Sequence, residues 1–364
     1  MRNILISGAS IAGLSTAWWL RKLGYQVTVV EQAPAPRTAG AAVDIRDEAV
    51  AIVKRMGLFD RMRLERLQVE CMEFKNEANV TECSIDVPDS ETDIEIERTA
   101  FLRIMMEDLG DEVEFIFNDR VTALWETSDA MQVSLKSGLQ GAFDLVLGCD
   151  GMHSGVRKLW FGEESEYAHF LEAYFSIAIV NKLLVPTSRM QGYNEPGKAV
   201  MLNAYNGKTD IIFCFVAKNE IPYDYRNVEQ QRQLISENFA DSGWRTKELL
   251  DEVMRADNFY FDKFCQIKMP AWTKGRVALV GDAAYCASPA AGMGASLSIA
   301  GAAALGDALL KHPGDHIAAF REYDQVLRPF IERVQATAAL NVRTTFLPRT
   351  EEEIQERNWQ MTGF

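Results

Sequence analysis

The feature that most constrains the fold of this chain is a glycine-containing turn near its N-terminus. An apolar run over residues 4–6 leads into Gly8, a mostly apolar helix is predicted over residues 11–23, and a second apolar run ends at Glu31. This order of strand, glycine turn, helix, strand and acid is typical of a unit that binds a dinucleotide. The helix N-terminus holds the pyrophosphate, and the acid accepts hydrogen bonds from ribose hydroxyls.

The turn departs from the usual G-x-G-x-x-G pattern at one position. Gly8 permits the tight turn after the strand, Gly13 lets the helix pack against that strand, and Ser10 replaces the middle glycine. Serine is small enough to leave the backbone close to a phosphate. The alternative is a plain βαβ unit whose glycines serve packing alone, and the turn by itself leaves this alternative open.

A second segment, far downstream, narrows the choice of dinucleotide. The apolar run over residues 277–280 ends in Gly281-Asp282 and is followed by an uncharged stretch over residues 283–306. This pattern predicts another strand, which delivers a carboxylate to a sharp turn before a helix. Together with the N-terminal turn, it indicates that the dinucleotide is FAD.

Composition sets limits on partners and location. The chain has 364 residues, of which 48% are hydrophobic and 25% charged, so two joined domains with a sizeable core are possible. A net charge of −14 argues against a nucleic-acid partner and against an anionic membrane surface. Residues 283–306 are long enough to suggest a membrane span, but their small residues and Pro289 favour a buried turn and helix.

Cysteine and histidine usage points to a cytoplasmic protein without a metal site. The six cysteines form no C-x-x-C pair, so we expect reduced, buried thiols. His153 and His169 lack metal-ligand spacing. A core strand is expected to begin directly after Met1 and Arg2, and we therefore expect no cleavable signal peptide.

Apolar periodicity predicts a mixed α/β fold with interleaved domains. We expect a Rossmann-like FAD-binding domain, a β-sheet substrate-binding domain and a C-terminal segment of long helices. Their ranges are 1–70, 98–168 and 270–325 for the first, 71–97 and 169–269 for the second, and 326–364 for the third. The expected helices after the first cover residues 49–56, 99–109, 228–239, 246–254, 295–310 and 316–339. The expected strands beyond residue 31 cover 69–75, 80–87, 114–117, 121–126, 131–135, 144–148, 174–180, 199–205, 211–216 and 259–268.

Three motifs, in this order, resemble those of single-component FAD-dependent aromatic hydroxylases of the para-hydroxybenzoate hydroxylase type. They are the turn at residues 8–13 with Glu31, an Asp-Gly motif at residues 149–157, and a Gly-Asp motif at residues 281–294. The resemblance extends over almost the whole chain. Residues 43–46 and 55–58 also resemble the branch that contains tetracycline-inactivating monooxygenases.

The resemblance implies a set of site residues. In the family, the aspartate matching Asp282 binds a flavin ribityl hydroxyl, Arg98 matches an arginine that contacts FAD, and a Pro-x-x-Gly-x-Gly turn lies beside the isoalloxazine ring. The implied cofactor-binding residues are Gly8, Ser10, Ile11, Ala12, Gly13, Glu31, Gln32, Asp44, Arg46, Arg98, Asp150, Gly151, Gly281, Asp282, Pro289, Gly292, Met293, Gly294 and Ala295. Catalysis is expected at Pro289, Gly292 and Gly294, where the backbone can approach the ring and free N–H groups can stabilise negative charge.

The same resemblance implies the reaction. NAD(P)H reduces FAD, O2 adds to form a C4a-hydroperoxide, and one oxygen passes to an aromatic or polycyclic phenol or enol, a small-molecule substrate. We expect a monomer or homodimer that contacts neither nucleic acid nor membrane. Three alternatives stay open. One is a related flavin-dependent halogenase, although the Trp-x-Trp-x-Ile-Pro motif of that group is absent. The others are an FAD-dependent dehydrogenase or reductase and a non-catalytic flavin-binding protein.

Two positions depart from the family pattern, and both are expected near the flavin. Tyr285 stands where the family usually has histidine, and Ser296 where it usually has asparagine. A further question concerns aromatic residues in the predicted β-sheet domain, which either form its core or line a substrate pocket. They are Tyr174, Phe175, Phe213 and Phe215.

Overall fold

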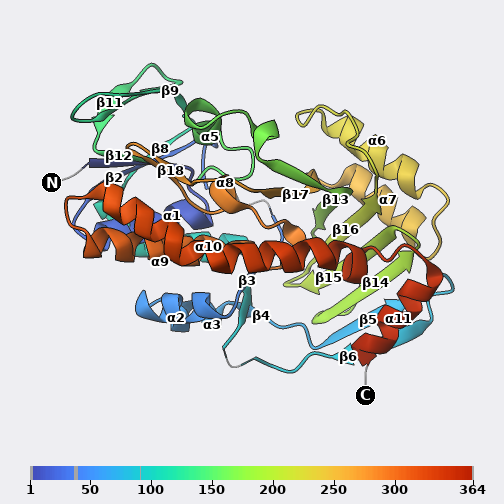
Figure 1. The fold of residues 1–364 in the computed structure, drawn as a ribbon. Coiled ribbons are helices and arrows are strands. Elements are labelled where there is room, and N and C mark those ends of the chain that lie inside the picture. The colour runs from blue at the N-terminus through green and yellow to red at the C-terminus, as the bar shows by residue number, and fades with distance from the viewer. Residues whose placement is uncertain (1–2, 37–39, 91, 363–364) are drawn as a thin grey trace.

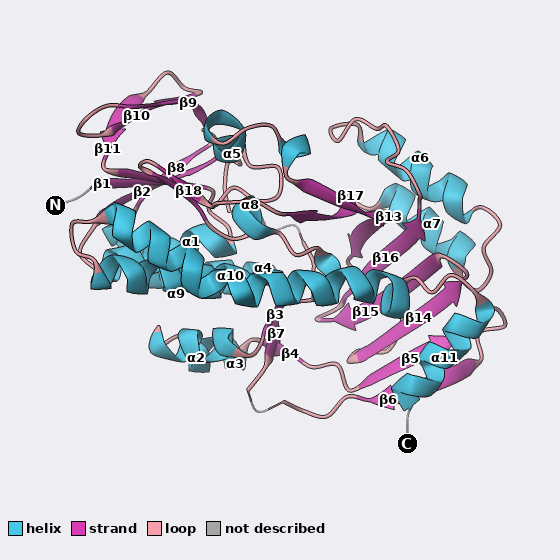
Figure 2. Cartoon of the chain, viewed as in Figure 1, coloured by secondary structure: helices cyan, strands magenta, loops and turns pink. Residues whose placement is uncertain are grey.

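Two large sheets organise the computed structural model, which describes residues 3–36, 40–90 and 92–362 (Figure 1). One sheet has six strands in the order β18-β19-β12-β1-β2-β8, and the other has seven in the order β17-β13-β16-β15-β14-β5-β6. The described residues also form two three-stranded sheets, β11-β10-β9 and β3-β7-β4. The predicted mixed α/β fold with long C-terminal helices is confirmed (Figure 2). The loop expected at residues 33–40 lies partly outside the described residues.

The six-stranded sheet brings distant parts of the chain to one edge. Its strands are β1 (Asn3–Ser7), β2 (Gln26–Glu31), β8 (Glu114–Phe117), β12 (Leu145–Gly148), β18 (Thr273–Lys274) and β19 (Val277–Leu279). Apart from the β18–β19 pair, neighbouring strands are parallel, and their apolar runs are buried as expected for a sheet covered on both faces. Ser7 pairs in register with Val30 and with Gly148, so the strands carrying the first two motifs end together.

The seven-stranded sheet has two distinct faces because side chains alternate along each strand. Its strands are β5 (Cys71–Lys75), β6 (Thr81–Asp86), β13 (Ala168–Val180), β14 (Arg189–Glu195), β15 (Lys198–Tyr205), β16 (Lys208–Val216) and β17 (Asn258–Ile267). Tyr174, Phe213 and Phe215 pack in one core with residues of α6 (Val228–Phe239) and α7 (Thr246–Arg255). Phe175 lies on the opposite face, in a separate core with Ala290. The first three aromatics are therefore core residues under the helices, and only Phe175 faces the side of the Gly-Asp motif.

A small sheet and its helices lie beside the two large sheets. The sheet contains β3 (Val43–Ile45), β4 (Arg66–Leu67) and β7 (Ile94–Ile96), and the helices are α2 (Glu48–Arg55), α3 (Phe59–Leu64) and α4 (Arg98–Leu109). Ile45, Ile94 and Ile96 are fully buried on one face. Alternation therefore turns Asp44 and Glu95, which are register partners, toward the other face.

The remaining elements cover or extend these sheets. They are α1 (Ile11–Lys22), β9 (Val121–Glu126), β10 (Met131–Leu135), β11 (Gln140–Phe143), α5 (Gly155–Trp160), α8 (Asp282–Tyr285), α9 (Gly294–Lys311), α10 (His316–Asn341) and α11 (Glu351–Thr362). Helix α9 packs between α1 and α10, and α11 lies against β6 and β14. In Figure 1, α10 runs from the six-stranded sheet to the seven-stranded sheet. No helix among the described residues is both long and apolar enough to span a membrane.

Candidate active site at the junction of three motifs

The N-terminal turn has the geometry that a bound phosphate requires. Gly8 adopts φ +104°, and a Cβ there would lie 2.5 Å from the carbonyl oxygen of Cys149. A Cβ on Gly13 would lie 1.9 Å from the carbonyl oxygen of Gly8, so only glycine lets α1 pack this closely. Ser10 precedes α1 with an extended backbone and makes no side-chain cap bond. The N-terminus of α1, with Ile11 and Ala12, therefore points its N–H groups at this turn.

The predicted ribose acid lies at the same turn. One carboxylate oxygen of Glu31 accepts the N–H of Ala9 at 2.9 Å and the other accepts the N–H of Ala33 at 2.9 Å. Glu31 is 7% exposed, whereas the neighbouring Gln32 is exposed. The carboxylate of Glu31 therefore lies against the glycine turn, where a dinucleotide-binding unit places its ribose acid.

The Gly-Asp motif meets this turn directly. Gly281 adopts φ +71°, and a Cβ there would lie 2.9 Å from the Cβ of Ala12. Asp282 follows as the first residue of α8 and is partly buried. Burial raises the pKa of the Asp282 carboxyl, while the positive charge of Arg98 opposes this shift. Arg98 comes from the first turn of α4 and lies against Gly40, whose Cβ would be 2.7 Å from its Nη1.

The turn at residues 289–294 presents backbone to the outside of the core. Pro289, Gly292 and Gly294 are exposed, whereas Ala290 and Ala295 are buried, and Met293 is partly exposed. Gly292 is left-handed with φ +60°, and a Cβ on Gly294 would meet no protein atom within 4 Å. The backbone at Gly294 is therefore open to a ligand, as proposed from the sequence for the flavin ring.

Asp44 and Arg46 lie over this turn. Arg46 Nη2 pairs with Asp44 Oδ1 at 2.9 Å, and both side chains would be 3.9 Å from a Cβ on Gly292. Ser296 fixes this arrangement, because its Oγ accepts the N–H of Arg46 at 2.9 Å and donates to the carbonyl oxygen of Asp44 at 3.0 Å. The departure at position 296 thus has a clear structural role in joining β3 to α9.

Tyr285 does not face the turn, contrary to the expectation that this position lies near the flavin. Its side chain is fully buried, its ring centroid is 4.7 Å from that of Trp272, and its hydroxyl oxygen lies 3.2 Å from that of Tyr323. The phenol also lies where a Cβ on Gly301 of α9 would be. Tyr285 is therefore a packing residue between α9 and α10.

The Asp-Gly motif lies beside β1, but its bonds are internal to the protein. Asp150 accepts hydrogen bonds from the hydroxyl of Ser154, from the N–H of Val156 at 3.1 Å and from the hydroxyl of Ser7 at 3.4 Å. Gly151 adopts φ +83° in the turn that follows. Asp150 thus holds the N-terminus of α5 against the end of β1, and this is the role that a simple turn residue would have.

Sequence reasoning missed Arg157 of α5 as a connecting residue. It is 1% exposed and donates from Nη1 to the carbonyl oxygen of Ala283 at 2.9 Å and from Nη2 to Glu164 at 3.1 Å. The ring of His153 is hydrogen-bonded to the carboxylates of Glu164 and Asp262, and these two bonds raise the pKa of His153 to about 9. The available signal was an arginine nine residues after the end of the buried strand β12. Across the described chain, no group of His, Cys, Asp and Glu side chains is arranged to hold a metal ion.

These features fit FAD without rearrangement. The two glycines leave no room for a side chain at the phosphate turn, carboxylates of Glu31 and Asp282 flank it, and Gly294 offers open backbone at the other end. The glycine turn, the acid and the carboxylate of α8 lie along one edge of the six-stranded sheet. The fold and this edge therefore define a flavoprotein.

Comparison with known proteins agrees with this class. The family described as FAD binding domain matches residues 1–335. A flavin-dependent monooxygenase from an unknown prokaryotic organism is 33% identical over 365 residues, covering 98% of this chain and 94% of that protein. The uncharacterized protein Rv1260 of Mycobacterium tuberculosis (strain ATCC 25618 / H37Rv) is 32% identical over 349 residues, covering 94% of each. The crystal structure of tetracycline destructase Tet(55) is similar with a TM-score of 0.88 and 32% identity, covering 100% of this chain and 95% of that chain.

The chain therefore belongs to the FAD binding domain family. It is an FAD-dependent monooxygenase, and the sequence-based expectation of this class is confirmed.

Proposed function

We propose that the enzyme uses NAD(P)H and O2 to hydroxylate an aromatic or polycyclic phenol or enol. The observation that carries this proposal is the position of the 289–294 turn against the apolar face of the seven-stranded sheet. Ala290 packs in one core with Phe175, while Pro289 and Gly292 stay exposed beside it. A flavin ring bound at this turn would therefore face the apolar side of the seven-stranded sheet.

That surface continues as a row of partly exposed apolar side chains. Ile177 pairs in register with Ile212, which pairs with Met201 on the next strand. All three are partly buried and belong to the same face as Phe175. A flat, electron-rich ring would cover this row, and burying its apolar area would favour binding by about 25 cal/mol per Å².

The chain's own residues would have three tasks. Glu31, Asp282 and Arg98 would hold FAD, which when bound supplies an electrophilic oxygen atom derived from O2. Gly292 and Gly294 would let the backbone approach the ring, and the N–H groups at the start of α9 would stabilise negative charge. The apolar row would exclude water and orient the substrate. Reduction by NAD(P)H would take place in the cytoplasm, which agrees with six free, buried cysteines.

Oxygen incorporation provides the test. FAD-loaded protein should oxidise NADH or NADPH slowly alone and faster with a substrate from a panel of polycyclic phenols that includes tetracycline. With labelled O2, one labelled atom should then appear in the product. Turnover that proceeds equally well without O2, using another electron acceptor, would contradict the proposal.

A further inference from the structure

Two carboxylates project from the small sheet toward the proposed substrate surface. Asp44 of β3 and Glu95 of β7 are register partners and share a face, which is the face opposite the buried Ile94 and Ile96. Asp44 already pairs with Arg46 at 2.9 Å above Gly292. Within the part of the chain that the structure describes, Glu95 forms no ion pair, and its carboxyl group receives one amide donor, Asn203 Nδ2, at 3.3 Å.

Asn203 supplies a second and independent indication of a ligand. It is 7% exposed, and its Oδ1 has no hydrogen-bond partner within the described part of the chain. A buried carbonyl oxygen left without a donor destabilises the protein unless a ligand supplies that donor. Because Nδ2 of the same amide contacts Glu95, this acceptor lies next to the carboxyl group.

The position of Asn203 connects the carboxylate to the apolar row. Asn203 follows Met201 by two residues on β15 and pairs in register with Asp210, just as Met201 pairs with Ile212. Asn203 therefore lies on the same sheet face, one row closer to β7. A substrate ring that covers Met201 and Ile212 would bring its nearest substituent close to Asn203 and Glu95.

The surroundings of Glu95 favour its uncharged form. Burial raises its pKa to about 7, the negative charge of Asp44 adds to this shift, and Arg46 opposes it. Asp210 of β16, itself shifted to a pKa of about 6 by burial, adds a smaller repulsion. On strand β4 the register partner of Glu95 is Leu67, which carries no charge. A carboxyl group in this setting can hold or release a proton near neutral pH.

We propose that Glu95 accepts the proton of a substrate hydroxyl group, and that Asn203 Oδ1 accepts a second donor from the same substrate. This inference rests on the proposed function and narrows the substrate to a phenol or enol with a further hydrogen-bond donor close by. In the step, the substrate O–H bond breaks, an O–H bond forms on Glu95, and the electron pair stays on the substrate oxygen. The resulting anion is more electron-rich at the ring carbons and so a better acceptor of electrophilic oxygen.

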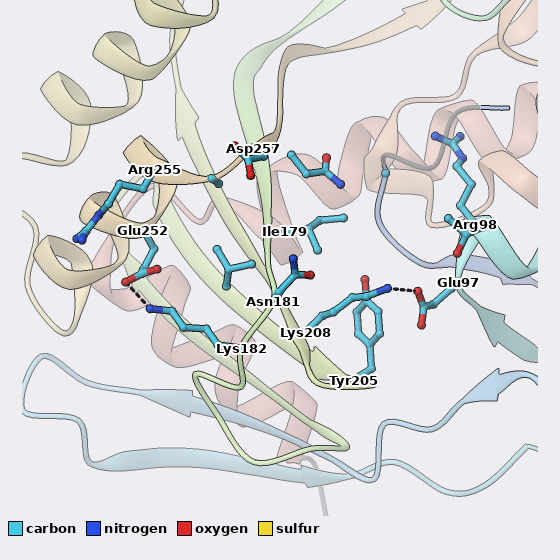
Figure 3. A pocket seen from close by; sticks show the side chains of 15 residues that line it. Glu97, Arg98, Ile179, Asn181, Lys182, Tyr205, Lys208, Glu252, Arg255 and Asp257 are labelled. Atoms are coloured by element: carbon cyan, nitrogen blue, oxygen red, sulfur yellow. Dashed lines mark hydrogen bonds and ion pairs between the residues drawn. The ribbon is translucent and has the colours of Figure 1, made fainter. Parts of the chain in front are cut away.

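A matched control lies two residues further along the chain. Glu97 accepts a hydrogen bond from Lys208 Nζ at 2.7 Å, and this pair lines a separate cavity of about 440 Å³ together with Arg98 and Tyr205 (Figure 3). Its bonds to Asn206 and Lys208 keep the pKa of Glu97 below its ordinary value, although burial acts in the opposite direction. Glu97→Gln replaces the same chemical group at a carboxylate that Asn206 and Lys208 already pair, and it leaves the Asn203–Glu95 contact in place.

The experiment compares two probes that differ only in the hydroxyl group. Binding of 4-nitrophenol and of its methyl ether, 4-nitroanisole, is measured by calorimetry on FAD-loaded wild-type, Glu95→Gln and Glu97→Gln proteins. Wild type and Glu97→Gln should prefer the phenol, on the order of tenfold, and Glu95→Gln should lose that preference while keeping its affinity for the ether. The wild-type preference should be greatest near neutral pH, where ionised Glu95 meets the un-ionised phenol, and Glu95→Gln should lose this maximum.

Two results would overturn the inference. One is a Glu95→Gln protein that folds, binds FAD and retains the phenol preference with its pH dependence. The other is wild-type protein that binds both probes equally or binds neither. Failure of the proposed function is seen separately, because it would leave the phenol preference intact while no labelled oxygen enters any product.

Discussion

Arg157 donates a hydrogen bond from Nη1 to the carbonyl oxygen of Ala283 at 2.9 Å, across 126 residues of sequence. This contact ties the first turn of α8, which carries Asp282, to helix α5 of the Asp-Gly motif. The same guanidinium donates to Met152 and Glu164, so one buried cation organises three segments at the edge of the six-stranded sheet.

Replacing Arg157 should therefore destabilise the site as a whole. Arg157→Met would leave two carbonyl groups without this donor and would remove one of the partners of Glu164, and we expect the free energy of unfolding to fall by about 1–3 kcal/mol for each carbonyl group. Chemical denaturation followed by fluorescence measures this loss. Lys158→Met is the control, since Lys158 pairs with Glu163 at the surface and is 65% exposed. Equal stability of the two variants would contradict the connecting role.

The glycines of the phosphate turn should differ sharply from other glycines in their tolerance to substitution. Gly13→Ala should abolish FAD retention, because the new Cβ would lie 1.9 Å from the carbonyl oxygen of Gly8. Gly24 has positive φ, but a Cβ at this residue would meet nothing within 4 Å. Gly24→Ala should therefore lower the free energy of unfolding by about 1 kcal/mol and keep FAD bound. Flavin absorbance per protein after gel filtration distinguishes these outcomes. Normal FAD content in Gly13→Ala would mean that α1 can shift away from the turn.

Asp282→Ala should weaken FAD binding by on the order of 1.5–3 kcal/mol, the contribution of a hydrogen bond to a charged group. The dissociation constant of FAD, measured by fluorescence quenching on reconstituted protein, gives this value. Asp307→Ala is the control, because Asp307 is a surface residue of α9 that pairs with Arg55 at 2.6 Å. An unchanged FAD affinity in Asp282→Ala would remove this residue from the cofactor site.

Gly294→Val should separate folding from catalysis. A side chain at this position meets no protein atom within 4 Å, so the melting temperature should stay close to that of wild type. The isopropyl group would occupy the space proposed for the flavin ring, and NAD(P)H oxidation should then yield H2O2 at the expense of hydroxylated product. Peroxide and product are quantified in the same reaction. Full coupling in this variant would mean that the ring lies elsewhere.

Glu95 should make stability depend on pH in a defined direction. Its pKa is about 7 in the folded protein against 4.5 as the ordinary value, so the folded state binds the proton more tightly. Stability should consequently fall as pH rises from the ordinary pKa to the folded pKa, by at most about 3 kcal/mol. Glu95→Gln, which cannot ionise, should remove this loss and be more stable than wild type above neutral pH. Parallel pH profiles of the two unfolding free energies would contradict the shifted pKa.

Local sequence patterns were sufficient for most of the fold. The expected ranges 114–117, 121–126, 131–135 and 228–239 coincide with β8, β9, β10 and α6, where alternation or a helical apolar face is uninterrupted. Strand β13 begins at Ala168, earlier than the expected residue 174, because an irregularity between Phe170 and Tyr174 with Glu172 at φ +55° breaks the alternation. Strand β14 was missed because its sequence RMQGYNE has no apolar run, although it pairs on both sides.

The candidate site was predictable where a motif carries the geometry and unpredictable where only tertiary contact does. The sequence places Gly8 and Gly281 in turns after apolar strands, and the structure adds the positive φ of both residues, which the sequence alone does not show. The orientation of Tyr285 depends on Tyr323 and Trp272, which no local pattern relates to it. The contact of Asn203 with Glu95 joins strands of two different sheets, so it becomes visible only in the folded protein.

Helix α10 has a mechanical consequence for movement of the two large sheets. Tyr323 donates to the carbonyl oxygen of Leu279 in the six-stranded sheet, Gln335 donates to that of Ile267 in the seven-stranded sheet, and Asn341 donates to that of Ala290. One helix, α10, is thus hydrogen-bonded to both large sheets and to the turn between them. A hinge motion that separates the two sheets would therefore have to bend α10 or break its hydrogen bonds to one of them.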